Sequence, residues 1–384
     1  MKQVLISGAS GFLGHWLIDA LKADQPNLKI VSLSRKPKKQ LGVDRAIQAD
    51  LSRWDAGLSE ADIAELQSEK FDLFIHLAGL YDLRVSSEDG YLHNVFGTHN
   101  ALHLAELFKI PTFAHISTVA VTMGRGRAMN HRMADASIRR PEFHEKPSDA
   151  HDNRPIAPDQ ELRGPFPDHY ATSKSEAEKL VRNWSGEFPK RKLILRPGIL
   201  VGDSKEGKIL RVDGPYQAID AFRRLRKVLE IWQGRMPRSL RSPLPLPGHP
   251  DRRIPLVPVD LAARVISKIT LSFSQSEELT KSYYVAPSNG PTARELYSSA
   301  LRHLGLNCDV HITSGIPDSI IKPVAEWVAR LPREELEYVI NLPDLDLSSS
   351  DAIVRELLGN DFYPPFSQLE NTLWRGFDGY AQNR

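Results

Sequence analysis

The chain has 384 residues, an apolar fraction of 41% and a formal net charge of +2. The length is enough for one large domain with a smaller one, and the near-neutral charge argues for no particular partner. Nucleic-acid binding is not expected, because no nucleic-acid-binding motif accompanies the positive charge in the sequence. The single cysteine, Cys308, excludes a disulfide framework within the chain and a cysteine-only metal site.

The first predicted element is a buried parallel strand at Val4–Ile6, followed by a glycine-rich turn and an amphipathic helix over His15–Lys22. Gly8 would permit the tight turn, Gly11 would let the backbone approach a pyrophosphate, and Gly14 would let the helix pack closely on the strand. A plain structural turn is the alternative. We predict a dinucleotide whose pyrophosphate lies on the helix N-terminus, with these contacts: Gly8, Ser10, Gly11, Phe12, Leu13 and Gly14.

A second strand, predicted at Lys29–Leu33, ends at a basic corner. Enzymes that use NAD usually carry an acidic residue about 20 residues after the turn, where it binds the ribose hydroxyls. Here the chain offers Ser34 and Arg35 with several lysines behind them. Cations at this corner fit a 2′-phosphate, so we predict NADP(H) as the cofactor. A solvated basic loop is the alternative.

Four more elements complete the alternating pattern. A third strand should end at Asp50 and Leu51, where a carboxylate commonly meets the adenine, and a fourth at Phe71–Leu77 runs into Ala78 and Gly79, which are small enough to pass close to the cofactor. A helix carrying Asn94 and a strand at Thr112–Ile116 follow. The alternation of strands and helices predicts an α/β fold with a doubly wound parallel sheet of the Rossmann type.

The next informative stretch is a predicted helix over Ala171–Val181, preceded by Tyr170. Tyr170 and Lys174 are four residues apart and therefore face the same way. An ammonium beside a phenol lowers the pKa of the phenol, and such a Tyr can exchange a proton with a substrate oxygen while a nicotinamide handles the hydride. Taken alone, a pair of this kind is more often surface decoration, and its weight comes from the glycine-rich turn upstream.

Together these motifs resemble the extended short-chain dehydrogenase/reductase family over roughly residues 1–270. The motifs shared in order are Gly8–Gly14, Asp50-Leu51, Ala78-Gly79, Asn94–Thr98, Ser117-Thr118, Tyr170–Lys174 and Arg196-Pro197-Gly198. The resemblance implies that Thr118 orients the substrate carbonyl, Tyr170 is the acid/base, Lys174 binds the ribose and activates Tyr170, and Asn94 supports a proton-relay water. Ser117 is the neighbouring alternative to Thr118. Pro197, Gly198 and Ile199 are expected at the cofactor.

A narrower resemblance begins at Leu195–Ser204 and continues through Gly207, Asp213–Tyr216 and Val257–Asp260. These residues are similar to the NADPH-dependent thioester reductase branch, which includes fatty acyl-CoA reductases and the terminal reductase domains of peptide and polyketide synthases. The resemblance implies reduction of an acyl thioester, on coenzyme A or an acyl carrier protein, to an aldehyde or alcohol. A sugar nucleotide or a hydroxysteroid-like alcohol or ketone is the alternative substrate, and an NADP(H)-sensing regulator is the non-enzymatic alternative.

We expect an NADP(H)-binding domain at residues 1–204, with a polar insert at about 123–169, and a mainly substrate-binding region at 205–384 from which strands and helices return to the core. The insert would be a lid, a partner-binding segment or a longer loop without a function of its own. Its histidines are not spaced as the ligands of a metal site are. Arginines crowd residues 222–253, where they could receive coenzyme A phosphates or a carrier protein, or form a solvated face.

Residues 316–331 predict an amphipathic helix, which would be core, the wall of an acyl tunnel or a peripheral lipid contact. Closing helices are expected near 345–358 and 362–380. No apolar run approaches the ~20 residues that span a bilayer. The chain leads straight into its first strand, so we expect no targeting segment, a cytoplasmic location and either a monomer or a homodimer.

Overall fold

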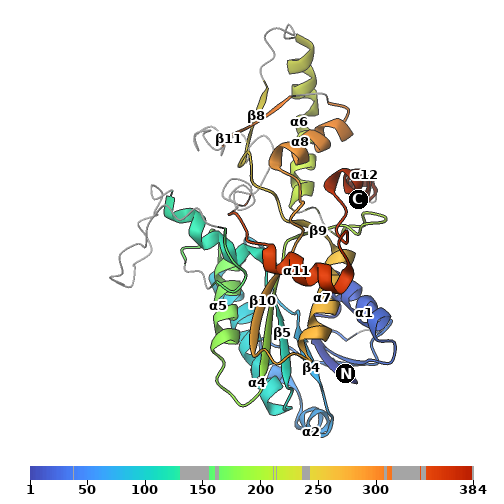
Figure 1. The fold of residues 1–384 in the computed structure, drawn as a ribbon, viewed down its shortest axis with the longest axis vertical. Helices are drawn as coiled ribbons and strands as arrows, with labels where there is room; N and C mark the ends of the chain where they lie inside the picture. The colour runs from blue at the N-terminus through green and yellow to red at the C-terminus, as the bar shows by residue number, and fades with distance from the viewer. Residues whose placement is uncertain are drawn as a thin grey trace.

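The computed structural model describes residues 1–37, 39–129, 155–160, 164–210, 212, 214–235, 243–306, 309–313, 338 and 343–382. Its centre is a seven-stranded parallel sheet in the order β3-β2-β1-β4-β5-β6-β10 (Figure 1). The strands are β1 Gln3–Ser7, β2 Lys29–Ser34, β3 Arg45–Gln48, β4 Leu73–His76, β5 Thr112–Ile116, β6 Arg191–Pro197 and β10 Thr280–Val285. The predicted doubly wound α/β fold is confirmed.

Helices cover both faces of this sheet. The helices α1 (Phe12–Asp24), α7 (Val259–Phe273) and α11 (Ser348–Leu358) belong to one face, and α4 (Gly97–Leu107) belongs to the other, together with the helix α5 (His169–Asn183). A short helix α2 (Glu60–Ser68) precedes β4 and carries a capping box at its N-terminus.

The apolar runs form central strands because both of their faces are buried. In β1, Val4 and Ile6 contribute to the core beneath α1 and α7, whereas Leu5 contributes to the core beneath α4. Burying a side chain of this size stabilises the fold by roughly 1.5–3 kcal/mol. The register aligns Val4 with Ile30 of β2 and with Leu73 of β4, so the centre of the sheet is apolar on both sides.

The strand order reverses at β1, between β2 and β4. In open α/β sheets, ligands bind at such a switch point, outside the carboxyl ends of the strands. Ser7 and His76 are the last residues of β1 and β4 and lie side by side in the register. The glycine-rich turn and the Ala78-Gly79 segment therefore leave the sheet at neighbouring points of the same edge.

A second cluster of elements lies towards the end of the molecule away from α2 (Figure 1). Two strand pairs occur there, β7 (Ile199–Val201) with β9 (Leu256–Pro258) and β8 (Leu244–Pro247) with β11 (Val310–Thr313). The helices are α6 (Pro215–Arg235), α8 (Ala293–His303) and α12 (Phe366–Gln382). Tyr216, Trp374 and Phe377 are almost fully buried in its core.

Several predicted features fall partly or wholly outside the described residues. These are the helix at 316–331, Cys308, Lys38, Asp213, most of the polar insert, and residues 236–242 of the arginine-rich segment. The described part of the insert is anchored: the Ile156 N–H donates to the carbonyl of Asp344 at 3.0 Å, and the Asp346 N–H donates to the carbonyl of Ile156 at 3.0 Å. This stretch is thereby attached to the chain that precedes α11.

Candidate active site

The glycine-rich turn is pressed against the end of β4. Gly8 has φ +79°, and a Cβ at this position would lie 2.6 Å from the backbone nitrogen of Ala78. A Cβ on Gly14 would lie 2.4 Å from the carbonyl oxygen of Ala9, because α1 runs very close to the turn. The geometry therefore admits only glycine at Gly8 and Gly14.

The N-terminus of α1 is open to an anion. The helix begins at Phe12 after Gly11, and no side chain among the described residues caps it. The N–H groups of a first helical turn have no partner within the helix, and the helix dipole favours negative charge there. The turn thus fits the pyrophosphate of a dinucleotide, with Ser10 and Leu13 adjacent to it.

The corner beyond β2 brings the predicted adenosine-side residues together. Ser34 is half-buried at the end of β2 and Arg35 is exposed just after it. Burial opposes ionisation of Asp50, but hydrogen bonds from the N–H and O–H of Ser52, aided by the charge of Arg35, lower the pKa of Asp50 below its ordinary value. Leu51 follows, and its carbonyl accepts a hydrogen bond from Asn100 at 2.8 Å. A cation and an anion therefore lie near one another at this corner beyond β2.

Tyr170 and Lys174 lie at the start of α5, whose N-cap residue Asp168 accepts a hydrogen bond from the Ala171 N–H at 2.7 Å. Tyr170 is 7% exposed and Lys174 is 6% exposed. Burial lowers the pKa of Lys174 to about 8, against the opposing charge of Glu178. Both side chains are thus withdrawn from water, where an ammonium acts more strongly on a neighbouring phenol.

Gly79 lies beside two of the predicted catalytic residues. A Cβ at Gly79 would lie 3.1 Å from Asn94 Oδ1 and 3.7 Å from Lys174 Nζ. The segment after β4 therefore runs between η2 (Tyr91–Phe96), a π-helical turn that carries Asn94, and α5. Turns of this kind are frequent at functional sites.

The Asn94 amide is fully engaged by its surroundings. Its Oδ1 accepts from the Leu80 N–H at 2.7 Å, and its Nδ2 donates to Ser173 Oγ at 2.9 Å and to the carbonyl of Leu80 at 3.2 Å. The Ser173 hydroxyl in turn donates to the carbonyl of Tyr170 at 2.9 Å. Asn94 therefore connects the segment after β4 to the helix of Tyr170, and its role towards a water stays a prediction.

The two adjacent hydroxyls after β5 have different surroundings. Ser117 is 6% exposed, and its hydroxyl is buried without a hydrogen-bond partner among the described residues. Thr118 is half-buried, and its Oγ1 accepts a hydrogen bond from the Ala120 N–H at 3.2 Å. Since Ser117 is buried and Thr118 is only half-buried, the geometry favours Thr118 as the hydroxyl available to a substrate.

Aromatic and apolar side chains surround Tyr170. Its ring meets that of Tyr81 edge to face, with 5.1 Å between the centroids. Val85, Phe166 and Ala120 pack in the same cluster, which Tyr338 also contacts. The Tyr338 hydroxyl donates to Asp168 Oδ2 at 2.8 Å, so a residue of the C-terminal region contacts the cap of α5.

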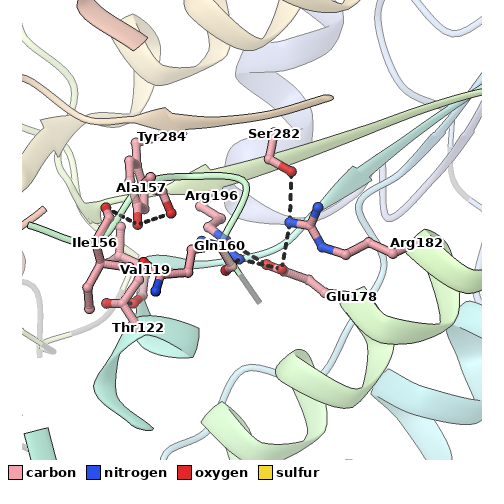
Figure 2. Close-up of polar contacts among 10 residues, drawn as sticks. All are labelled: Val119, Thr122, Ile156, Ala157, Gln160, Glu178, Arg182, Arg196, Ser282 and Tyr284. Atoms are coloured by element: carbon pink, nitrogen blue, oxygen red, sulfur yellow. Dashed lines mark hydrogen bonds and ion pairs between the residues drawn. The ribbon is translucent and has the colours of Figure 1, made fainter. Parts of the chain in front are cut away.

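A buried ion-pair network behind Lys174 was not predicted. Figure 2 shows Glu178 between Arg196 and Arg182. Arg196 Nε and Nη2 donate to the two oxygens of Glu178 at 2.9 and 2.7 Å, and Arg182 Nη2 lies 3.6 Å from Glu178 Oε2. Burial alone would raise the pKa of Glu178, but the charge and hydrogen bonds of Arg196 hold it below its ordinary value. Tyr170, Lys174, Glu178 and Arg182 recur every four residues, and this repeat is the sequence signal for one continuous face of α5.

The network also anchors the described part of the polar insert. Arg196 Nη2 donates to the carbonyl of Gln160 at 3.2 Å, and the guanidinium lies 5.7 Å from the centre of the Tyr284 ring. The Tyr284 hydroxyl donates to the carbonyl of Ile156 at 3.0 Å, as Figure 2 shows. Residues of β6, β10 and the insert thereby meet behind the helix that carries Tyr170.

The predicted segment Pro197-Gly198-Ile199 lies at the carboxyl end of β6, on the same edge as the glycine-rich turn. The Gly198 N–H donates to the carbonyl of Val285 at 3.0 Å, and the Ile199 N–H donates to the carbonyl of Pro255 at 2.8 Å. A Cβ on Gly198 would lie 2.1 Å from that Pro255 oxygen. This segment therefore joins β6 to the paired strands β7 and β9.

Several arginines of the arginine-rich segment at residues 222–253 form contacts within the protein. Arg223 and Arg224 both form ion pairs with Asp220, an acidic residue that lies just before residues 222–253. Arg223 also lies 5.3 Å from the centre of the Phe377 ring, and Arg253 Nη1 donates to the carbonyl of Gly290 at 2.7 Å. Part of the positive charge is thus used within the protein.

Comparison with known protein families identifies the family to which this chain belongs. Residues 44–266, more than half of the chain, match the family described as male sterility protein. The chain belongs to this family. The matched range contains Asn94, Thr118, Tyr170 and Lys174, and it confirms the resemblance to the extended short-chain dehydrogenase/reductases of the fatty acyl-CoA reductase and thioester reductase branch.

Individual relatives in this family share parts of the chain. Fatty acyl-CoA reductase 2 of Bos taurus is 30% identical in an alignment 148 residues long that covers 30% of this chain and 28% of that protein. L-2-aminoadipate reductase of Schizosaccharomyces pombe is 26% identical in an alignment 231 residues long that covers 54% of this chain and 15% of that protein. The matched regions thus span less than a third of these relatives' own length.

Solved structures share the fold over the whole chain. The terminal R domain from the myxalamid PKS-NRPS biosynthetic pathway has a TM-score of 0.69 at 20% identity, covering 99% of this chain and 91% of that domain. A thiolation-reductase di-domain from an archaeal non-ribosomal peptide synthetase has a TM-score of 0.66 at 15% identity, covering 100% of this chain and 76% of that one. MoeE5, solved with UDP-glucuronic acid and NAD, has a TM-score of 0.60 at 16% identity and covers 99% of this chain and 100% of that one.

Within the part of the chain that the structure describes, no group of histidine, cysteine, aspartate and glutamate side chains could hold a metal ion. None of the helices in that part has both the length and the apolar character that a membrane span needs.

Proposed function

We propose that this protein is an NADPH-dependent reductase that converts an acyl thioester to an aldehyde or alcohol. One observation carries the proposal: Tyr170 and Lys174 are buried on one face of α5, with Lys174 beside Gly79 at the sheet edge where the glycine-rich turn also lies. The names of the relatives support the substrate class, since fatty acyl-CoA reductases and an aminoadipate reductase share parts of this chain.

Tyr170, Thr118 and Lys174 have complementary roles in this proposal. When bound, NADPH supplies the hydride that reduces the thioester carbonyl carbon by two electrons. Thr118 and Tyr170 donate hydrogen bonds to the carbonyl oxygen, where negative charge develops. Lys174 keeps the pKa of the Tyr170 phenol low enough for proton exchange. The carbon–sulfur bond then breaks, the thiol leaves with a proton, and the aldehyde forms.

The residues that would hold the dinucleotide follow β1 and β2 or lie on α5. The turn from Gly8 to Gly14 and the open N-terminus of α1 fit the pyrophosphate, and Lys174 fits the nicotinamide ribose. We propose NADP(H) over NAD(H) because Arg35 follows β2, where a 2′-phosphate would pair with a guanidinium.

The test is NADPH oxidation, with NADH in parallel, against acyl-CoA thioesters of increasing length and the same acyl groups on a carrier protein, with any aldehyde trapped as it forms. Turnover that prefers NADPH and yields aldehyde or alcohol would support the proposal. Tight NADPH binding without turnover of any thioester would contradict the substrate class. In that case a sugar nucleotide or a diffusible alcohol or ketone becomes the substrate to test.

A further inference from the structure

His76, the last residue of β4, lies in the interior beneath the predicted cofactor site and has a partner for each ring nitrogen. Its side chain is 1% exposed. Nδ1 lies 2.8 Å from Ser7 Oγ of β1, and Nε2 lies 3.1 Å from Thr98 Oγ1 of α4. The imidazole therefore connects the strand that leads into the glycine-rich turn with the helix that follows Asn94.

The neighbouring bonds fix the direction of both contacts. The Thr98 hydroxyl donates to the carbonyl oxygen of Asn94 at 2.6 Å, so the Thr98 oxygen must accept from His76. Nε2 therefore carries the proton. In a neutral imidazole the other nitrogen is an acceptor, so Nδ1 accepts from the Ser7 hydroxyl. Ser7 Oγ is then left to accept from the Ala78 N–H at 3.3 Å, which it does.

The surroundings of the ring keep it neutral. Burial lowers the pKa of His76 to about 3, and the nearby charge of Lys174 acts in the same direction. His115 of β5 stacks on the ring with 5.4 Å between the centroids, and burial also lowers its pKa. A second proton on His76 would remove the acceptor of the Ser7 hydroxyl and would bring a cation close to Lys174.

We propose that His76, held as the neutral Nε2–H tautomer, is a positioning residue that joins the dinucleotide turn to Asn94. On one side it accepts a hydrogen bond from Ser7, the residue before Gly8, and the Ser7 hydroxyl in turn accepts from the N–H of Ala78, the residue before Gly79. On the other side it holds Thr98, and through it the backbone of Asn94. Asn94 continues the connection through Ser173 to the backbone of Tyr170. The proposal rests on the proposed function, since it assumes that a dinucleotide binds at the turn and that Tyr170 reacts.

His115 provides a matched control. It is fully buried, it lies on the adjacent strand, and its ring is parallel to within 28° of that of His76. Neither of its ring nitrogens has a hydrogen-bond partner within the described part of the chain. His115→Phe therefore keeps an aromatic ring and removes no bond, whereas His76→Phe keeps a ring and removes both bonds.

Two conservative variants separate the two halves of the connection. In His76→Gln the amide nitrogen can still reach Thr98, but nothing accepts from Ser7. In His76→Asn the amide oxygen can still accept from Ser7, but nothing donates to Thr98. We expect His76→Gln to raise the Kd of NADPH roughly tenfold with kcat nearly unchanged, and His76→Asn to lower kcat roughly tenfold with the Kd nearly unchanged, as one unsatisfied buried group implies.

The tautomer can be measured without any substrate. In protein labelled with 15N-histidine, the signal that disappears in His76→Gln should show a proton on Nε2 and none on Nδ1, and it should not titrate from about pH 5 to about pH 9. A proton on Nδ1, or titration within this range, would overturn the proposal. The His76 signal can also be assigned by through-bond correlation to its own backbone, so this result decides the matter even if the variants do not fold.

The binding and activity measurements complete the test. NADPH affinity is measured by fluorescence titration and does not depend on the identity of the acyl substrate. Absence of thioester turnover in the wild type would therefore refute the proposed function while leaving the Kd and tautomer results to judge His76. Equal effects of His76→Gln and His76→Asn on both Kd and kcat, or an effect of His115→Phe as large as that of His76→Phe, would show that His76 only fills space.

Discussion

The ammonium of Lys174 donates a hydrogen bond to the backbone carbonyl of Ile116 at 2.7 Å, which ties α5 to the end of β5. Glu178, the acid one turn further along the same face of the helix, is engaged by Arg196. Lys174 is therefore buried with only partial compensation of its charge. The Lys174 ammonium therefore remains available to a ligand. Its buried charge should also make the free energy of unfolding depend on pH.

The stability of the protein should depend on the protonation of Lys174. Its pKa of about 8 in the folded state is below the ordinary value of 10.5 expected in the unfolded chain. Between these pH values the unfolded chain binds more protons, so this group makes the free energy of unfolding rise with pH; below pH 8 the cost of its buried charge is fully present. Urea denaturation of wild type and Lys174→Met across this range measures the effect.

In that experiment we expect Lys174→Met to remove the rise, so that its advantage over the wild type is greatest below pH 8 and shrinks above it. Lys179→Met controls for the loss of one positive charge from the same helix. Identical pH dependence in wild type and Lys174→Met would contradict the assignment.

Glu178 should be needed for folding stability. Glu178→Gln leaves the Arg196 guanidinium buried without its counter-charge, which costs roughly 3–5 kcal/mol when a buried pair is broken. The matched control is Glu176→Gln on the same helix, where the partner Lys179 lies 2.7 Å away near the surface. Loss of such an exposed pair costs about 1 kcal/mol or less. Similar losses in the two variants, measured by chemical denaturation, would argue against the network.

Thr118 should matter to the reaction more than its neighbour. Thr118→Val removes the hydroxyl and keeps the shape, and we expect kcat to fall roughly 10²–10³-fold, the effect of losing one donor to a developing oxyanion. Thr118→Ser keeps the hydroxyl and should retain most of the activity. Ser117→Ala should leave kcat within a few-fold of the wild type. A larger loss of kcat in Ser117→Ala than in Thr118→Val would reverse the assignment.

Arg35 should determine the choice between the two cofactors. Arg35→Ala should weaken NADPH binding by about 1.5–3 kcal/mol, the range for a hydrogen bond to a charged group, and leave NADH binding nearly unchanged. Lys36→Ala, the exposed neighbour, is the control. Titration of each variant with both dinucleotides gives the answer, and an equal loss for NADPH and NADH would mean that Arg35 does not contact the 2′-phosphate.

Local patterns were sufficient to predict most of the central sheet. The apolar runs at β1, β2 and β5 are short and bounded by glycine, basic or polar residues, and each forms a buried strand near its predicted limits. The four-residue spacing of Tyr170 and Lys174 likewise predicted one face of a helix, because helical geometry alone decides it.

Features that depend on distant partners could not be read from local patterns. Glu178 and Arg196 come from a helix and a strand whose register only the folded sheet sets. Ser7, His76 and Thr98 belong to three separate elements, and each of them alone is an ordinary buried polar residue. The ion pair of Arg223 with Asp220 could have been predicted, because residues three apart on a helix lie close together. It was missed because Asp220 lies just before the arginine-rich segment at residues 222–253.

The most direct test of the proposed reaction is transfer of deuterium from NADPH deuterated at both C4 positions to the acyl carbon of a thioester, followed by mass spectrometry, with Tyr170→Phe alongside. We expect the wild type to form an aldehyde with one deuterium on its carbonyl carbon, or an alcohol with two on the corresponding carbon. Tyr170→Phe should bind NADPH as the wild type does and form the labelled product roughly 10²–10⁴-fold more slowly, as loss of a general acid implies. An unlabelled acyl product, or full activity in Tyr170→Phe, would contradict the proposed reaction.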